Sequence, residues 1–342
     1  MALLAMEGFE RYTDASDLEL DSNVALEESS AFSFVTGKDS LGRAVRMNGT
    51  APRMAFPIVG GTASTFYLGF AFRVAAYPSS YTNILYAYEP DYTDLCFTLR
   101  LNANGTMEYL RTGAISLGTT GAIAENAWNY LVLKVFIDNT TGTLEFWRNG
   151  TKDLDLTGQD TRDTGTSIGA FRFHAPNGGT WDYDDIYIGD NSGSDMTDQV
   201  GEVHIEMVLP NADGNRNNFT RVGGGTNNYE AVDDGTTSDG DTTYLYSSTA
   251  TNGELFGHAA LTGNVDTIYA VNVAARVRKE DAGNRSINLI ARSSATESDS
   301  GQKGMNTYYT WQSAFFENDP NGGGAWTESA VNAAEFGLEI GV

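Results

Sequence analysis

The sequence predicts an all-β protein made of two antiparallel β-sandwich domains, with one short helix near the C-terminus. Three observations predict this class. Apolar residues alternate with polar ones in many short runs, turn-forming segments separate these runs, and glycine makes up 38 of the 342 residues. Strands with one apolar face are buried by pairing two layers of sheet, and a chain of this length has enough apolar residues for two cores.

The first half contains a dense series of predicted strands. From Phe66 to Val74 the even positions are apolar, which predicts a strand with one buried face. Residues 95–101 repeat this rhythm, and the turn at 102–106 predicts a hairpin with 107–111. Segment 128–137 is apolar on both faces and is expected to be a central, doubly covered strand. Further strands are expected at 143–148, 151–156, 168–174 and 185–188.

A domain boundary is expected near residue 195. The stretch from Gly189 to Asp195 lacks apolar side chains and is rich in turn formers, which is the composition of an exposed linker. We therefore predict a first domain at 1–195 and a second at 196–342.

The second half combines alternating runs with a long stretch rich in Gly, Asn and Asp. Alternation predicts strands on either side of that stretch, and proline ends a strand because it lacks the N–H group. A threonine hydroxyl followed by glutamate predicts a helix start. The expected elements are a strand at 203–209 ended by Pro210, an irregular connection at 211–240 with a short strand at 229–232, a hairpin at 268–292, strands at 308–316 and 336–340, and a helix at 328–335 capped by Thr327.

The charge of the chain limits its partners. Asp and Glu number 45 against 21 Lys and Arg, so the formal net charge is −24. This charge repels phosphate backbones and anionic membrane surfaces, and we expect no nucleic-acid and no membrane partner. The N-terminus has no cationic segment followed by an apolar run, so secretory export is not expected. Cys96 stands alone, so no intrachain disulfide is available, and we expect a buried thiol.

The usual catalytic spacings are missing from the sequence. His174, His204 and His258 lie in unrelated segments without a zinc-binding spacing, and structural roles are expected for them. Glu202 and Glu206 share a face of the predicted 203–209 strand, but no aromatic residues flank them to hold a sugar ring, so catalysis is not expected there.

One segment brings aromatic rings and carboxylates together. Trp181 and Tyr183 alternate with Asp182 and Asp184, and these residue types stack on sugar rings and accept hydrogen bonds from sugar hydroxyls. The alternative is a polar strand edge that binds nothing. Asp182, Asp184 and Asp190 are also candidate Ca²⁺ ligands, although the acidic loops lack the regular spacing of a calcium loop. No other cofactor is expected.

An ordered series of short motifs runs through the chain. The first half contains Met6-Glu-Gly-Phe9, Asn126-Ala-Trp-Asn-Tyr130, Gly158-x-Asp-Thr-Arg162 and Asp184-Asp-Ile-Tyr-Ile188, and the second contains Leu209-Pro-Asn-Ala-Asp-Gly214 and Tyr229-Glu-Ala-Val-Asp233. The series resembles the concanavalin A-like, laminin-G-like jelly-roll domain of structural proteins in tailed bacteriophages, followed by a module that accompanies it.

This resemblance implies a jelly roll in the first domain and a module for virion assembly or attachment in the second. It implies a non-catalytic subunit of a head decoration or of a tail or fibre appendage, which assembles in the host cytoplasm as a homo-oligomer with other virion proteins. The E-x-D-x-x-E strand of related sandwich glucanases is missing, so no enzyme is expected. The alternative is a lectin-like receptor-recognition protein of the tail, with a host-surface glycan as partner.

Overall fold

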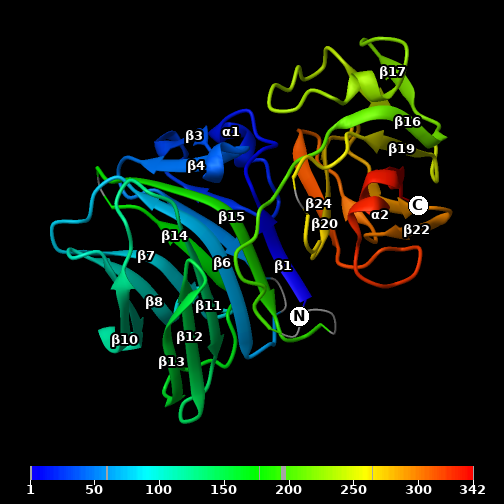
Figure 1. Ribbon diagram of the computed structural model, residues 1–342. Helices are drawn as coiled ribbons and strands as arrows, with labels where there is room; N and C mark the ends of the chain where they lie inside the picture. The colour runs from blue at the N-terminus through cyan, green and yellow to red at the C-terminus, as the bar shows by residue number, and fades with distance from the viewer. Residues whose placement is uncertain (1, 59–60, 177, 194–197, 264, 342) are drawn as a thin grey trace. The chain divides into compact units, whose positions relative to one another are not determined.

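The computed structural model describes residues 2–58, 61–176, 178–193, 198–263 and 265–341, and nearly all of its regular structure is β (Figure 1). The all-β prediction is therefore confirmed. The chain forms two compact units. Unit 1 comprises Met1–Glu10, Asp14–Glu19 and Asn23–Ile205, and unit 2 comprises Arg11–Thr13, Leu20–Ser22 and Glu206–Val342. The boundary expected at 195 lies among residues 194–197, outside the described residues, and the observed division follows Ile205.

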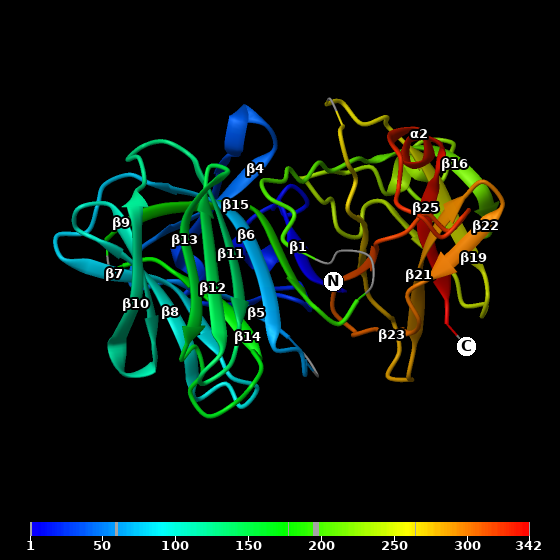
Figure 2. The same cartoon turned by 60° about the horizontal axis from the view of Figure 1, so that its bottom comes forward.

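Unit 1 is a sandwich of two antiparallel sheets (Figure 2). The eight-stranded sheet has the order β13-β12-β11-β6-β15-β4-β3, and β1 pairs with β15. Its strands are β1 (Ala2–Glu7), β3 (Phe32–Thr36), β4 (Arg43–Asn48), β6 (Thr65–Val74), β11 (Asn129–Phe136), β12 (Gly142–Arg148), β13 (Thr151–Gln159) and β15 (Thr180–Asp190).

The second sheet of unit 1 has seven strands in the order β10-β9-β8-β7-β14-β5-β2. They are β2 (Ala25–Glu27), β5 (Arg53–Pro57), β7 (Tyr81–Tyr88), β8 (Leu95–Asn102), β9 (Thr106–Arg111), β10 (Ile115–Ala122) and β14 (Ala170–His174). Short helical turns connect some of the strands of unit 1, namely α1 (Ala15–Leu18), η1 (Ser29–Ala31), η2 (Lys38–Ser40) and η3 (Thr112–Ala114).

Aromatic rings fill the space between these two sheets. Phe70 of β6 and Phe173 of β14 meet edge to face with their centroids 5.2 Å apart, and Tyr183 of β15 lies 5.2 Å from Phe173. Each large ring buries roughly 150–250 Å² on folding, so these contacts dominate the stability of the sandwich. The alternating apolar residues of the sequence supply them.

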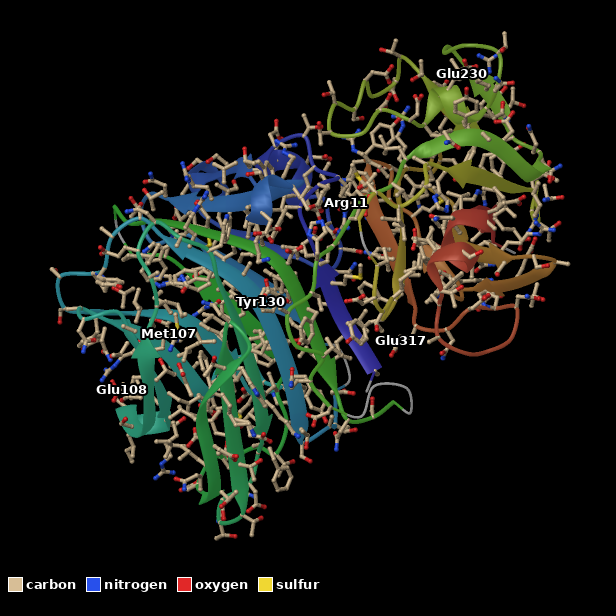
Figure 3. The ribbon with its side chains drawn as sticks, viewed as in Figure 1. Arg11, Met107, Glu108, Tyr130, Glu230 and Glu317 are labelled. Carbon is tan, nitrogen blue, oxygen red and sulfur yellow. The ribbon has the colours of Figure 1, made fainter. Side chains whose placement is uncertain are left out.

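The outer face of the eight-stranded sheet is covered as well. Tyr67, Tyr130 and Tyr187 form a buried cluster there, and Val203 from the chain after β15 packs against it. Tyr130, labelled in Figure 3, donates its hydroxyl to the carbonyl oxygen of Asp185 at 2.9 Å. The prediction of a doubly covered strand at 128–137 is therefore confirmed, whereas β6 is buried on both faces and not on one.

Unit 2 contains a six-stranded sheet in the order β16-β19-β25-β21-β22, with β23 paired to β21, and two separate strand pairs, β17-β18 and β20-β24. Val273, Leu289, Phe316 and Trp326 form its core. Its elements are β16 (Pro210–Asn217), β17 (Thr220–Val222), η4 (Tyr229–Ala231), β18 (Tyr244–Tyr246), β19 (Gly253–His258), β20 (Val271–Val277), β21 (Ser286–Ser293), β22 (Thr296–Asp299), β23 (Lys303–Gly304), β24 (Thr310–Phe316), α2 (Glu328–Ala333) and β25 (Glu335–Ile340).

The short C-terminal helix is confirmed as α2. Its cap forms as expected, because Thr327 Oγ1 accepts a hydrogen bond from the Ala330 backbone N–H at 3.1 Å. Among the described residues, no helix has the length and hydropathy required to cross a bilayer.

Three predictions for the second half are wrong. Residues 203–209 form no strand, since Val203 packs on the outer face of unit 1, and β16 begins at Pro210 instead of ending there. Residues 229–231 form a 3₁₀ turn. The strands within 268–292 exist but do not pair, because β20 pairs with β24 and β21 pairs with β25 and β22.

Candidate functional site

The aromatic residues predicted to hold a sugar lie inside unit 1. Trp181 is 1% exposed and Tyr183 is 0% exposed. The Trp181 ring lies 5.5 Å from that of Phe72, and the Tyr183 hydroxyl donates to the His174 carbonyl oxygen at 2.8 Å. A ring stacks on a sugar only where its face is open. The prediction of a sugar site at Trp181 and Tyr183 is therefore corrected, and both residues belong to the core.

Asp182 and Asp190 are held by the protein itself. Both carboxylates are buried. Asp182 forms ion pairs of 2.7 Å with Arg46 Nε and with Arg73 Nη2, and Asp190 Oδ1 accepts from the backbone N–H and the hydroxyl of Ser192. Both carboxylates thus have partners within the protein, and their predicted roles in binding a sugar or Ca²⁺ stay predictions.

Asp184 lies in a different environment. Its Oδ2 accepts from the Lys38 backbone N–H at 2.7 Å, and its Oδ1 accepts from the Asp185 backbone N–H at 2.8 Å. Burial and the neighbouring Asp185 raise the pKa of Asp184 to about 7. Burial, followed by repulsion from Asp184, raises the pKa of Glu10 well above its ordinary value. The structure thus brings Asp184 beside a glutamate that the sequence did not single out.

The carboxylate pair considered at Glu202 and Glu206 does not form. Glu202 belongs to unit 1 and pairs with Lys38 at 2.5 Å, whereas Glu206 belongs to unit 2 and accepts from the Thr262 hydroxyl at 2.7 Å.

A cluster of aromatic and basic side chains occupies the outward face of the seven-stranded sheet. Phe171 and Phe173 of β14 point into the core, so the alternating residues Arg172 and His174 point outward. Register places Arg172 opposite Tyr86 on β7. The outward cluster of Tyr86, Tyr88, Arg172 and His174 is called the Tyr–Arg face below.

Ring contacts organise the Tyr–Arg face. The Arg172 guanidinium carbon lies 4.5 Å from the centroid of the Tyr88 ring and 5.3 Å from that of Tyr86. The His174 ring meets Tyr86 edge to face at 5.9 Å. Cation–π contacts of this kind fix the orientation of both partners. All four side chains are half-buried, so each keeps part of its surface open to solvent.

Hydrogen bonds define the state of His174. Its Nδ1 lies 3.0 Å from the Asn83 carbonyl oxygen. A carbonyl oxygen only accepts, so Nδ1 carries the proton and Nε2 of the neutral ring is an acceptor. Burial lowers the pKa of His174, which keeps the ring neutral at pH 7. Asn83 Nδ2 in turn donates to the Tyr86 hydroxyl at 3.1 Å.

The Tyr–Arg face carries positive charge. Arg172 Nη1 lies 3.3 Å from Glu27 Oε1, and Arg53 Nη1 lies 2.5 Å from Glu27 Oε2. Two guanidinium groups thus share one carboxylate. Within the described part of the chain, the buried Nε of Arg172 has no hydrogen-bond partner. A basic surface on a chain with a net charge of −24 is a specific local feature and does not follow from the composition.

Sequence reasoning missed this face for an identifiable reason. The strand at 168–174 was expected, but no face was assigned to Arg172 and His174, which alternate with the buried Phe171 and Phe173. The partner strand β7 was not expected, because its apolar residues at Ile84 and Leu85 interrupt the alternation. Register shifts between Asn83 and Leu85 in the pairing of β7 with β8, which is the bulge behind that irregular pattern.

Comparisons with known proteins give weak similarities to solved structures. No family model matches the chain, and no curated protein matches it. The chain is similar to a sialidase (TM-score 0.42, 7% identity, covering 55% of this chain and 18% of that one). It is similar to an alginate lyase solved with an alginate trisaccharide, with a TM-score of 0.40 and 11% identity over 54% of this chain and 94% of that one. It is also similar to domain 4 of an arabinanase from Geobacillus stearothermophilus solved with arabinotriose, with a TM-score of 0.40 and 16% identity over 55% of this chain and 92% of that one.

These comparisons correct one prediction. The chain was expected not to be an enzyme, yet the structures to which it is similar include a sialidase, an alginate lyase and a domain of an arabinanase.

Proposed function

We propose that the protein binds carbohydrate through the Tyr–Arg face of unit 1. The observation that carries the proposal is the grouping of two tyrosines, an arginine and a neutral histidine on one open sheet face. Tyrosine rings pack against the C–H faces of sugars, a guanidinium donates to hydroxyl and carboxylate oxygens, and the histidine Nε2 accepts from a hydroxyl. A sheet surface presents these groups at fixed spacing, which lowers the cost of ordering them on binding.

The charge of the face supports a preference for acidic sugars. Arg172 and Arg53 share the carboxylate of Glu27, and Arg172 Nη2 also donates to the Tyr88 hydroxyl, so each guanidinium still has N–H groups beyond those in these contacts. A sugar carboxylate matches the planar fork of a guanidinium and forms paired hydrogen bonds with it. We therefore expect oligosaccharides of uronic acids to bind more tightly than neutral ones of the same length.

Calorimetric titration of the full chain with acidic and neutral oligosaccharides tests this function. Arg172→Ala is expected to weaken binding at least tenfold, because it removes the donors and uncovers both tyrosine rings. Tyr246→Ala is the matched control, since Tyr246 is an exposed tyrosine of unit 2. Equal affinity of the wild type and Arg172→Ala, with both proteins folded by circular dichroism, would contradict the proposal.

The motif resemblance supports a more specific proposal, that the chain is a virion subunit of a head decoration or tail appendage in which this face meets a glycan of the host surface. Repeated copies in a homo-oligomer would add weak contacts through avidity. Immunogold labelling of purified particles is expected to mark one structure on each particle. Absence of the chain from purified particles would contradict this assignment, and the calorimetric result would stand without it.

A further inference from the structure

A third tyrosine of β7 lies on the same sheet surface as the Tyr–Arg face. Strict alternation would direct Tyr81 and Tyr86 to opposite sides of the sheet, because an odd number of positions separates them. The bulge in β7 changes this, since it adds one residue between Asn83 and Leu85, and the extra residue Ile84 is fully buried like Leu85. Tyr81 therefore points outward as Tyr86 does, and it is 57% exposed.

The pairing of β7 with β8 supports this direction. Tyr81 lies opposite Asn102 on β8, two positions from Arg100. Leu101 between them is fully buried, so Arg100 and Asn102 point outward. Register partners in an antiparallel pair point to the same side, so Tyr81 shares the outward surface of the seven-stranded sheet with Arg100.

Arg100 holds the Tyr81 ring in a fixed orientation. The guanidinium carbon of Arg100 lies over the ring, 4.4 Å from its centroid. Glu108 on β9 anchors this guanidinium, because its Oε2 accepts from Arg100 Nε at 3.0 Å and from Nη2 at 2.8 Å. A single exposed tyrosine is ordinary on a protein surface, whereas this ring is oriented by residues of two further strands and still keeps more than half of its surface open.

The arrangement repeats the one at the Tyr–Arg face. At one end of β7 the Arg172 guanidinium lies against the Tyr88 ring, and at the other end the Arg100 guanidinium lies against the Tyr81 ring. At about 3.3 Å per residue, and with one residue taken up by the bulge, the two tyrosines are roughly 20 Å apart along the strand. This span exceeds a single sugar ring, so a ligand that contacts both ends is an oligosaccharide.

The two ends differ in charge. Arg172 and Arg53 share the single carboxylate of Glu27. Arg100 and Glu108 instead form a pair of one cation and one anion. An excess of guanidinium attracts a sugar carboxylate, and a balanced pair does not. The acidic sugar is therefore expected at Arg172, and the ring at the other end offers packing against the C–H face of a sugar.

We propose that Tyr81, oriented by Arg100, is a second sugar-binding position beside the Tyr–Arg face, and that the protein binds linear oligosaccharides that follow β7 with an acidic sugar at Arg172. This inference rests on the proposed function, because it extends the same surface. It adds a dependence of affinity on chain length. The second contact of a linked ligand is made without a second loss of translational freedom, so it strengthens binding.

Calorimetric titration of the full chain with hyaluronan oligosaccharides tests the inference, because glucuronic acid alternates with a neutral sugar in them. The wild type is expected to bind a hexasaccharide about tenfold more tightly than a disaccharide. Tyr81→Ala is expected to lose this gain and to bind the disaccharide as the wild type does, and the exposure of Tyr81 means that its truncation leaves the core intact. Arg172→Ala is expected to weaken the binding of both lengths.

Tyr81→Phe is the matched control, because it keeps the ring and removes only the hydroxyl. This variant is expected to keep the gain with chain length. Equal affinity of the wild type for both lengths, or an unchanged gain in Tyr81→Ala, would overturn the inference and leave the proposed function standing. Failure of the wild type to bind either length would also overturn it, and the titration of Arg172→Ala described above decides separately whether the proposed function holds.

Discussion

His174 shows how one residue reports on its surroundings. Its Nδ1–H donates to the Asn83 carbonyl oxygen and its ring packs edge to face against Tyr86, so the neutral form fits the Tyr–Arg face. Burial is the main cause that lowers its pKa below the ordinary value near 6.5. The folded state therefore resists taking up the proton that the unfolded chain accepts.

The pH dependence of stability follows from this shift. As the pH falls below about 6.5, the unfolded state binds a proton before the folded state does, so the contribution of His174 to stability is lost as the pH falls through its folded pKa. We expect His174→Gln to show a smaller loss of unfolding free energy between pH 7.5 and pH 5 than the wild type. Urea titrations at both pH values measure this change in the free energy of unfolding. A loss of the same size in both proteins would show that the titration of His174 does not affect stability.

The residue types at 181–184 suggested a sugar site, but residue type alone does not say whether a side chain is buried or exposed. Aromatic and acidic side chains alternate equally well in a central strand, where the rings fill the core and the carboxylates meet arginines from neighbouring strands. Arg46 and Arg73 are 136 and 109 residues away from Asp182 in the sequence, so no local pattern indicates these partners.

At the scale of elements, alternation located most of the long strands but not their neighbours. The strands at 66–74, 95–101, 128–137 and 308–316 are present because each carries an apolar stripe that a core must cover. Short edge strands such as β2 and β22 were missed, since their few residues are mostly exposed and have no periodic signal. Helix α2 was predictable because its capping residue, Thr327, directly precedes it in the sequence.

The strands β20 and β21 illustrate why pairing is harder to predict than position. A turn at 281–284 connects them, which favours a hairpin. Both strands, however, direct apolar residues such as Val273 and Leu289 into one core, and they lie in separate sheets on either side of it. Two strands that face each other across a core cannot also be hydrogen-bonded neighbours.

Cysteine crosslinking tests that arrangement. Ala274 and Ser313 are register partners on β20 and β24. The double variant Ala274→Cys and Ser313→Cys is expected to form a disulfide under mild oxidation, because paired residues have Cα atoms within bridging distance. Mass spectrometry of the unreduced digest detects it. Ala274→Cys combined with Ala291→Cys on β21 is the control, because a hairpin turned at 281–284 would pair these two residues, and a crosslink there instead would support the hairpin.

At the scale of the whole molecule, the N-terminal part of the chain takes part in both units. Residues 11–13 and 20–22 belong to unit 2, where the Trp311 backbone N–H donates to the Leu20 carbonyl oxygen at 2.9 Å. The Tyr12 hydroxyl donates to Asp21 at 2.8 Å, and the Tyr12 ring lies edge-on to Trp311 at 6.1 Å. Unit 2 therefore depends on residues that are distant in sequence.

Tyr12→Ala is expected to destabilise unit 2 selectively. Tyr12 is fully buried, and removing a large buried ring costs about 3–5 kcal/mol. Cys96 reports on unit 1, because its thiol is buried and burial raises its pKa to about 12, so it reacts only when that sandwich opens. We expect an early calorimetric transition in Tyr12→Ala while thiol labelling stays as slow as in the wild type. Rapid labelling at the early transition would show that both units unfold together.

An electron-density map of the full chain soaked with its tightest-binding acidic oligosaccharide tests the central claim most directly. We predict a sugar ring stacked on Tyr86 or Tyr88, with its carboxylate within hydrogen-bonding distance of Arg172. Sugar density on another surface, with the Tyr–Arg face exposed to solvent in the same crystal, would contradict it.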